Sequence, residues 1–210
     1  MTEKHVYFVR HGETDSNADG VYRGADAALT GTGRAQAEAV ADRIAQFGID
    51  ALIASPFSRT VDTANAIAAK TGHTIETNEL FIETRAPGEF FGRNYDASED
   101  LQQIIETIDS DADPHFRYSD EETFAESHAR AGQALEFLAT HPADALCVVT
   151  HGRFLRALFG VMLFGDRFEK PYLKDMMWRV GITNTGIVHA RYTPDRGWKL
   201  ISWNDHAHLG

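Results

Sequence analysis

Two short segments of this sequence share one plan, and together they constrain the fold more than any other feature. Residues 6–9 and 146–149 are apolar runs of β-forming residues, and each leads within two residues to a histidine that precedes a glycine, His11 and His151. In a parallel sheet the carboxyl ends of the strands lie along one edge, and ligands bind at that edge. We therefore expect both histidines to lie at the same edge of one sheet.

The rest of the chain alternates between strand and helix patterns. Apolar spacing predicts strands at 4–10, 50–54, 73–77 and 145–150, helices at 31–47, 58–72, 101–108 and 153–163, and a late hairpin from 186–192 and 198–203. A further helix is expected after residues 119–122, which have the spacing of a capping box. Ser55 or Ser58 is expected to cap the helix at 58–72, and residues 12–29 are expected to form a polar loop.

This alternation predicts an α/β fold, namely a three-layer α/β/α sandwich. Its sheet is expected to be mostly parallel, with an antiparallel edge strand contributed by the late hairpin. We expect one domain over residues 1–210, with residues 78–120 inserted as a small cap over the strand ends.

The composition argues against several classes of partner. The net charge is −11, which disfavours nucleic acid and anionic membrane surfaces, because both require clustered lysine and arginine. No apolar run is long enough to span a bilayer. The single cysteine, Cys147, lies in an apolar run, so no intrachain disulfide can form, and we expect a cytoplasmic protein.

The residues beside the two histidines suit phosphate chemistry. A neutral imidazole can attack phosphorus directly, and a neighbouring guanidinium such as Arg10 keeps the ring of His11 unprotonated. Arg59 falls in the first turn of a predicted helix, where free N–H groups favour a phosphate. Asn17 offers a neutral donor, and His151 can donate to an equatorial oxygen from the opposite side. The leaving group also needs an acid, for which Glu83, Glu13 and Glu89 are candidates.

Four blocks of sequence occur in a fixed order. They are Arg10-His11-Gly12-Glu13-Thr14 with Asn17, Leu29-Thr30 with Gly33 and Gln36-Ala37, Ser55-Pro56 with Arg59 and Thr63-Ala64, and Val149-Thr150-His151-Gly152. Together they resemble the signature of the histidine phosphatase superfamily, also called phosphoglycerate mutase-like. A lone Arg-His-Gly would carry little weight, whereas four ordered blocks are specific.

The resemblance implies a transient phosphohistidine on His11, with Arg10, Arg59 and His151 completing the phosphate pocket and Asn17 as a further donor. It implies no metal and no cofactor. Arg23 and Gly24 are candidates for binding the rest of a small phosphorylated substrate, as are the other arginines near the motifs: Arg85, Arg93, Arg117 and Arg153.

The proton donor is less well defined by the resemblance. Members of the family often carry a Leu-x-Glu…Gly-x-x-Glu-Gly pattern after the second block. Here Leu80 to Glu83 fits that pattern by order, but the spacing of the glycines departs from it, so Glu89 stays an alternative.

We therefore predict a metal-independent phosphatase that acts on a phosphomonoester. A phosphoglycerate mutase is the first alternative, although the resemblance implies a longer and more basic insertion for that task than the short acidic one here. A catalytically inactive phosphate-binding module is the second, although this chain keeps both histidines. The sequence leaves the substrate open, and residues 176–178 with Trp203 suit either a core or a homodimer interface.

Overall fold

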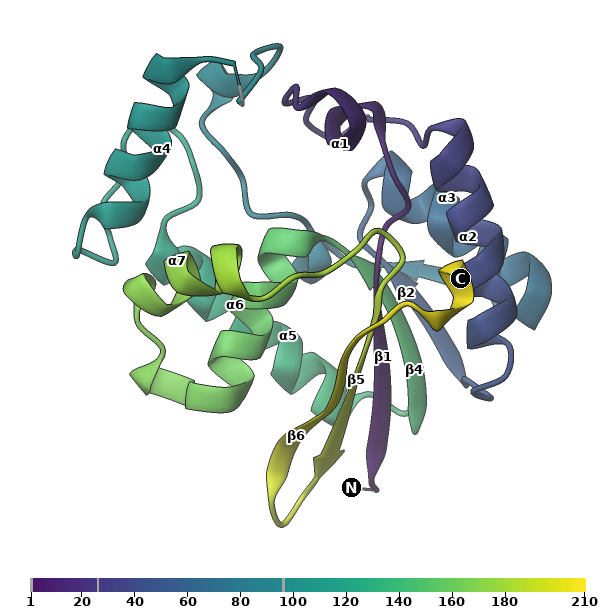
Figure 1. The fold of residues 1–210 in the computed structure, drawn as a ribbon. Coiled ribbons are helices and arrows are strands. Elements are labelled where there is room, and N and C mark those ends of the chain that lie inside the picture. The colour runs from purple at the N-terminus through teal and green to yellow at the C-terminus, as the bar shows by residue number, and fades with distance from the viewer. Residues whose placement is uncertain (1, 26, 96) are drawn as a thin grey trace.

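The computed structural model describes residues 2–25, 27–95 and 97–210, and it is built around one sheet of six strands (Figure 1). The strands are β1 (Lys4–Arg10), β2 (Ala51–Ala54), β3 (Ile75–Thr77), β4 (Ala145–Thr150), β5 (Ile187–Thr193) and β6 (Gly197–Asp205). Their order is β3-β2-β4-β1-β5-β6. The first four are parallel, and the hairpin of β5 and β6 adds antiparallel pairing on the far side of β1.

The register of the central strands brings three segments to one edge of the sheet. Arg10 pairs with Thr150, and Ala54 pairs with Val149, so β1, β2 and β4 end at the same level. The ladder continues for one more bond on each side, because the His11 N–H donates to the Thr150 carbonyl at 3.0 Å and the Ser55 N–H donates to the Val149 carbonyl at 3.0 Å. The residues that follow these strands are therefore neighbours, as the sequence predicts for the two histidines.

Helices cover both faces of the sheet and give it three layers (Figure 1). They are α1 (Asp15–Asp19), α2 (Gly31–Ile44), α3 (Ser58–Thr71), α4 (Glu99–Ser110), α5 (Phe124–Thr140), α6 (Gly152–Phe164) and α7 (Lys170–Arg179), with short 3-10 turns η1 (Glu79–Phe81), η2 (Gly88–Phe90), η3 (Gly165–Arg167) and η4 (Ala207–Leu209). Because strand side chains alternate between faces, Phe8 packs with α5 and α6, whereas Val9 packs with α2 and α3. The predicted α/β/α sandwich with an antiparallel edge is confirmed.

The segment 78–120 contains η1, η2 and α4. In Figure 1, α4 stands away from the sheet and beside α7, and the contact with α7 includes an ion pair between Glu106 and Lys174 at 2.6 Å. This segment is the one expected to act as a cap.

Two helices were not expected from the sequence. The short helix α1 lies within residues 12–29, where a loop was predicted, and α7 follows α6 after a turn. Helix α1 is held by a capping box in which Asn17 at its third position bonds back to Thr14. Only Lys170 and Leu173 of α7 are buried, so its apolar stripe is too short to signal a helix.

The prediction of a capping box at residues 119–122 is wrong. Helix α5 begins at Phe124, and its capping box is formed by Thr123 and Glu126, four residues beyond the predicted one. The earlier acidic residues have other partners: Glu121 accepts the backbone N–H groups of residues 118 and 119, and Glu122 pairs with Arg130 at 2.7 Å.

The predicted serine cap of α3 is also wrong. Phe57 occupies the N-cap position, and no side chain caps this helix. The Ser58 hydroxyl instead donates to the carbonyl groups of Ala25 and Ala27, at 3.2 and 3.3 Å, and this ties the loop before α2 to the start of α3.

Within the part of the chain that the structure describes, no helix is both long enough and apolar enough to cross a bilayer.

Candidate active site

The loop that carries His11 is fixed from two sides. On one side the backbone of Gly12 lies so close to α2 that a Cβ at this position would come within 2.5 Å of the Gly33 carbonyl oxygen. On the other side, Asn184 donates its amide to the His11 carbonyl at 3.0 Å, and the Thr185 N–H donates to the Arg10 carbonyl at 2.9 Å. Thr185 has φ 57°, an unusual value for a residue with a side chain. The position of His11 is therefore set by contacts to the backbone of residues 10–12.

The ring of His11 is held in one tautomer. Its Nδ1 lies 2.8 Å from the carbonyl oxygen of Gly12, and a carbonyl can only accept, so Nδ1 carries the proton. Burial, then the guanidinium groups of Arg59 and Arg10, hold the pKa of His11 well below its usual value of 6.5. A neutral ring protonated at Nδ1 leaves the lone pair on Nε2, which is the atom that could attack phosphorus.

His151 lies against His11, with 5.3 Å between the ring centroids, and is fully buried. Its Nδ1 accepts the Nε–H of Arg59 at 3.2 Å, which places the proton of the neutral ring on Nε2, 2.9 Å from the Ser55 hydroxyl. Burial, and then the charge of Arg59, lower the pKa of His151 well below its usual value. The sequence predicts that His151 donates to a phosphoryl oxygen; in this structure its Nε2–H is directed at Ser55, and its Nδ1 orients Arg59.

Arg59 is the second residue of α3, as the sequence predicts for an anion-binding position. Its side chain is 8% exposed, and its Nη1 donates to the carbonyl of Gly24 at 2.8 Å. The guanidinium also lies 5.1 Å from the centre of the Phe57 ring. The backbone carbonyl of Gly24 therefore helps to fix the position of the Arg59 guanidinium.

Arg10 presents a donor for which the described chain provides no partner. Its Nη1 donates to the Ile182 carbonyl at 2.7 Å, whereas its Nε is buried and makes no hydrogen bond with the described residues. A Cβ at position 152 would lie 3.3 Å from this Nε, so Gly152 leaves room for the side chain to pass. A buried guanidinium N–H without a partner is costly, and an anion would satisfy it.

Glu83 lies at the amino end of α6. Its carboxylate accepts the N–H of Phe154 at 2.8 Å and the N–H of Arg153 at 3.2 Å, in addition to the N–H of Thr84 at 2.9 Å. These bonds fix the carboxylate in the same cavity as His11, Arg10 and Arg59. Helix α6 therefore positions both the Glu83 carboxylate and, through its first residue, the Arg10 side chain.

A cavity of about 770 Å³ contains most of the predicted site. Its walls include Arg10, His11, Asn17, Arg23, Gly24, Arg59 and Glu83. The oxygen of the Asn17 amide accepts from Thr14 and Asn184, so its NH₂ group is the part free to face a ligand. His151 is behind this wall, and Glu89 is in η2 outside it. Of the three candidate acids, Glu83 lines the cavity, whereas Glu13 and Glu89 do not.

Most of the other candidate arginines have carboxylate partners. Arg23 pairs with Asp19, Arg93 with Asp100, Arg117 with Glu126 and Arg153 with Asp109. Arg85 donates to the backbone carbonyl of Asp120 at 2.7 Å. Four residues of the site were not expected from the sequence: Ser55 as the partner of His151, Asn184 as a clamp on His11, and Tyr22 and Tyr95, which line the cavity and contact each other. Their separation along the chain gave no local signal.

Among the described residues there is no cluster of three or more side chains suited to hold a metal ion.

The geometry agrees with the family assignment obtained by comparison. The sequence matches the histidine phosphatase superfamily (branch 1) over residues 6–206, and the chain belongs to this superfamily. It is 33% identical over 216 residues to a protein of Escherichia coli O1:K1 / APEC named probable phosphoglycerate mutase GpmB, with 97% of this chain and 94% of the relative covered. It is 28% identical over 208 residues to phosphoglycerate mutase-like protein 4 of Arabidopsis thaliana, with 97% and 86% covered.

Solved structures share the fold along nearly the whole chain. A mycobacterial glucosyl-3-phosphoglycerate phosphatase complexed with VO3 superposes with a TM-score of 0.78 at 23% identity, covering 96% of this chain and 98% of the other. A phosphoserine phosphatase mutant from Entamoeba histolytica, in complex with phosphoserine, superposes with a TM-score of 0.77 at 24% identity, covering 99% and 100%. At these identities the likeness establishes the fold alone. The match over residues 6–206 confirms the family expected from the four blocks.

Proposed function

We propose that this protein is a metal-independent phosphatase that hydrolyses a phosphomonoester through a phosphohistidine on His11. One observation carries the proposal: a neutral, Nδ1-protonated imidazole lies beside a buried guanidinium N–H that the described chain leaves without a partner. The first is a nucleophile directed at phosphorus, and the second is a donor for the charge that develops on the phosphoryl oxygens.

In the first step, Nε2 of His11 forms a bond to phosphorus while the bond from phosphorus to the leaving oxygen breaks. Arg10 and Arg59 would bind the equatorial oxygens, and the NH₂ group of Asn17 would add a donor at the rim. The leaving oxygen takes a proton from the carboxylic acid of Glu83. The Gly12 carbonyl keeps its bond to Nδ1–H and so stabilises the cationic ring of the phosphohistidine.

In the second step, water attacks the phosphorus of the phosphohistidine. The Glu83 carboxylate left by the first step accepts a proton from this water, and the N–P bond breaks to return the lone pair to His11. Inorganic phosphate then leaves, and the acid and the nucleophile are restored.

The size of the cavity favours hydrolysis of the phosphohistidine over transfer of its phosphoryl group back to a substrate, as a mutase requires. About 770 Å³ lies within the range of pockets that hold drug-sized ligands, and it exceeds what a phosphoglycerate would fill. Water would therefore reach the phosphohistidine. Two relatives carry mutase names, and two structural neighbours are named phosphatases, so both reactions belong in the test.

The test measures phosphate release from 4-nitrophenyl phosphate in parallel with isomerisation of phosphoglycerate. We expect release without isomerisation, and we expect His11→Ala to abolish it. His115→Ala serves as the matched control, because His115 is exposed and distant in sequence from the four blocks. Isomerisation faster than release would favour a mutase, and activity retained by His11→Ala would exclude the mechanism.

A further inference from the structure

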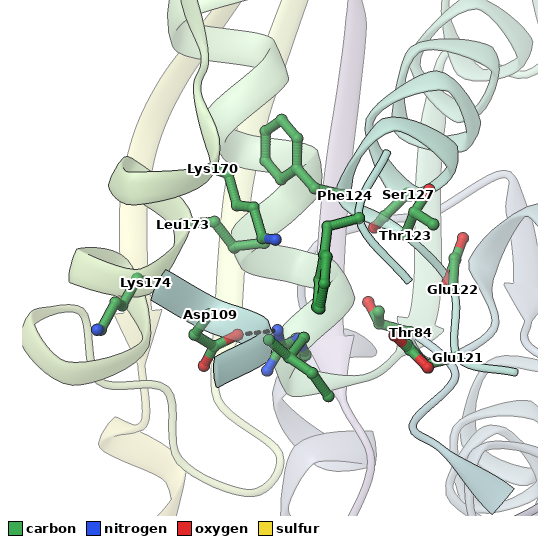
Figure 2. Close-up of a pocket in the computed structure, with 13 residues that line it drawn as sticks. Thr84, Asp109, Glu121, Glu122, Thr123, Phe124, Ser127, Lys170, Leu173 and Lys174 are labelled. Carbon is green, nitrogen blue, oxygen red and sulfur yellow. Dashed lines mark hydrogen bonds and ion pairs between the residues drawn. The ribbon is translucent and has the colours of Figure 1, made fainter. Parts of the chain in front are cut away.

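A second, small cavity lies where α4 meets α5, α6 and α7 (Figure 2). Its volume is about 30 Å³. Its wall shares Thr84, Asp109 and Arg153 with the large cavity that contains His11. The small cavity is therefore a recess next to the proposed active site, and we call it the Lys170 recess after the residue at its centre.

The Lys170 recess contains buried polar groups that lack partners. Lys170 is 7% exposed, and its Nζ makes no hydrogen bond with any described residue. The hydroxyl oxygens of Ser127 and Thr84 are also buried without a partner in the described chain. In Figure 2 the Lys170 side chain extends inward, toward the centre of the labelled residues. Three unsatisfied groups around one small space are unusual in a folded protein.

The other charged groups at the recess already have partners. Arg153 pairs with Asp109 at 2.9 Å, and Lys174 pairs with Glu106 at 2.6 Å. Glu122 pairs with Arg130 at 2.7 Å, and Glu121 accepts backbone N–H groups. Among the described cations at the recess, Lys170 is therefore the one whose N–H groups lack an acceptor, which a ligand could supply.

The surroundings of Lys170 offer only weak compensation for its charge. Its Nζ lies 5.3 Å from the centre of the Phe116 ring, and the carboxylates of Asp109, Asp111 and Asp113 act on it only beyond ion-pair distance. Burial lowers the pKa of Lys170, which shows that removal from water outweighs these attractions. An anionic ligand in the recess would therefore be stabilised by an ion pair with this ammonium group.

We propose that the Lys170 recess binds the carboxylate of the substrate's leaving group, with Lys170 as the cation and Ser127 and Thr84 as hydroxyl donors. A space of about 30 Å³ holds about two water-sized groups, which matches the two oxygens of a carboxylate. This inference rests on the proposed phosphatase function. It narrows the substrate class to phosphomonoesters whose leaving group spans the large cavity and carries a carboxylate at its far end.

The test uses phosphonates, which fill a phosphate site but are not hydrolysed. Two series of equal chain lengths are compared by calorimetry, namely alkylphosphonates and alkylphosphonates with a terminal carboxylate. At one chain length we expect the wild-type protein to bind the carboxylated member more tightly, on the order of ten- to a hundredfold, as a charge-assisted hydrogen bond allows. Lys170→Met should remove that preference, whereas Lys199→Met, which changes an exposed lysine of β6, should keep it.

Equal affinity for the two series at every chain length would overturn the inference and leave water as the content of the recess, while the proposed phosphatase function would stand. Absence of binding by both series would instead contradict the phosphate site itself. If Lys170→Met does not fold, Ser127→Ala, which removes one proposed hydroxyl donor of the recess, should weaken binding of the carboxylated member and leave the plain alkylphosphonate unchanged; equal effects on both would overturn the inference.

Discussion

Replacing Arg59 by methionine should damage both the phosphate site and the nucleophile. Two N–H groups of Arg59 already bond to His151 and Gly24, at 3.2 and 2.8 Å, and the rest of the guanidinium faces the cavity. Methionine keeps an unbranched apolar stem but removes the charge. The substitution therefore deletes the donors that we propose for the transition state, and it also deletes the largest charge effect on the pKa values of the two histidines.

Two effects of Arg59→Met are expected, a fall in kcat and a shift in the pH dependence of kcat/KM. Loss of one charge-stabilising donor costs ~10²–10³ in kcat. In addition, Arg59 is the leading charged group that lowers the pKa of His11, so its removal raises that pKa back toward 6.5. The wild-type protein should keep a neutral His11 below pH 6.5, and the acid limb of kcat/KM should move to higher pH in Arg59→Met.

The assay is the pH profile of 4-nitrophenyl phosphate hydrolysis, together with NMR titration of the ¹⁵N-labelled imidazole of His11. Arg196→Met, at an exposed position in the last hairpin, is the control and should change neither quantity. A titration of His11 that is identical in the wild-type protein and Arg59→Met would refute the electrostatic part of this reasoning, whatever happens to the rate.

Three further outcomes are expected. Glu83→Gln should slow alkyl phosphates more than 4-nitrophenyl phosphate, whose leaving group needs no proton; equal slowing would remove Glu83 as the acid. Gly33→Ala should destabilise the fold by ~1–3 kcal/mol in urea, because its Cβ would meet the Glu13 carbonyl at 2.0 Å, whereas Gly132→Ala meets no atom within 4 Å and should not. EDTA should leave hydrolysis unchanged, and inhibition that added metal reverses would contradict a metal-independent reaction.

The sequence predicted the sheet and the nearness of the two histidines because both have local signals. Strand ends are visible as apolar runs that stop at polar residues, and parallel pairing brings such ends together. His11 and His151 could thus be assigned to one edge although they are 140 positions apart, and in the structure their ring centroids are 5.3 Å apart.

Other features of the site arise only from tertiary contacts. The tautomer of His11 depends on the Gly12 carbonyl, and the orientation of His151 depends on Ser55 and Arg59, which no spacing rule reveals. Helix α7 escaped prediction because it buries few residues, and so the unpaired ammonium of Lys170 could not be found from sequence. The capping box was misplaced for the same reason. An acidic residue near the start of a helix can accept from other backbone N–H groups, as Glu121 does, or pair with an arginine, as Glu122 does.

Trapping the proposed phosphohistidine would show whether His11 is the nucleophile. The protein is mixed with a ³²P-labelled or unlabelled phosphomonoester and quenched in alkali within milliseconds. Peptide mass spectrometry and ³¹P NMR then identify the phosphorylated atom. We expect phosphate on Nε2 of His11, at an occupancy that decays as inorganic phosphate appears. Phosphate on another residue, or turnover with no phosphorylated protein at any time point, would contradict that expectation.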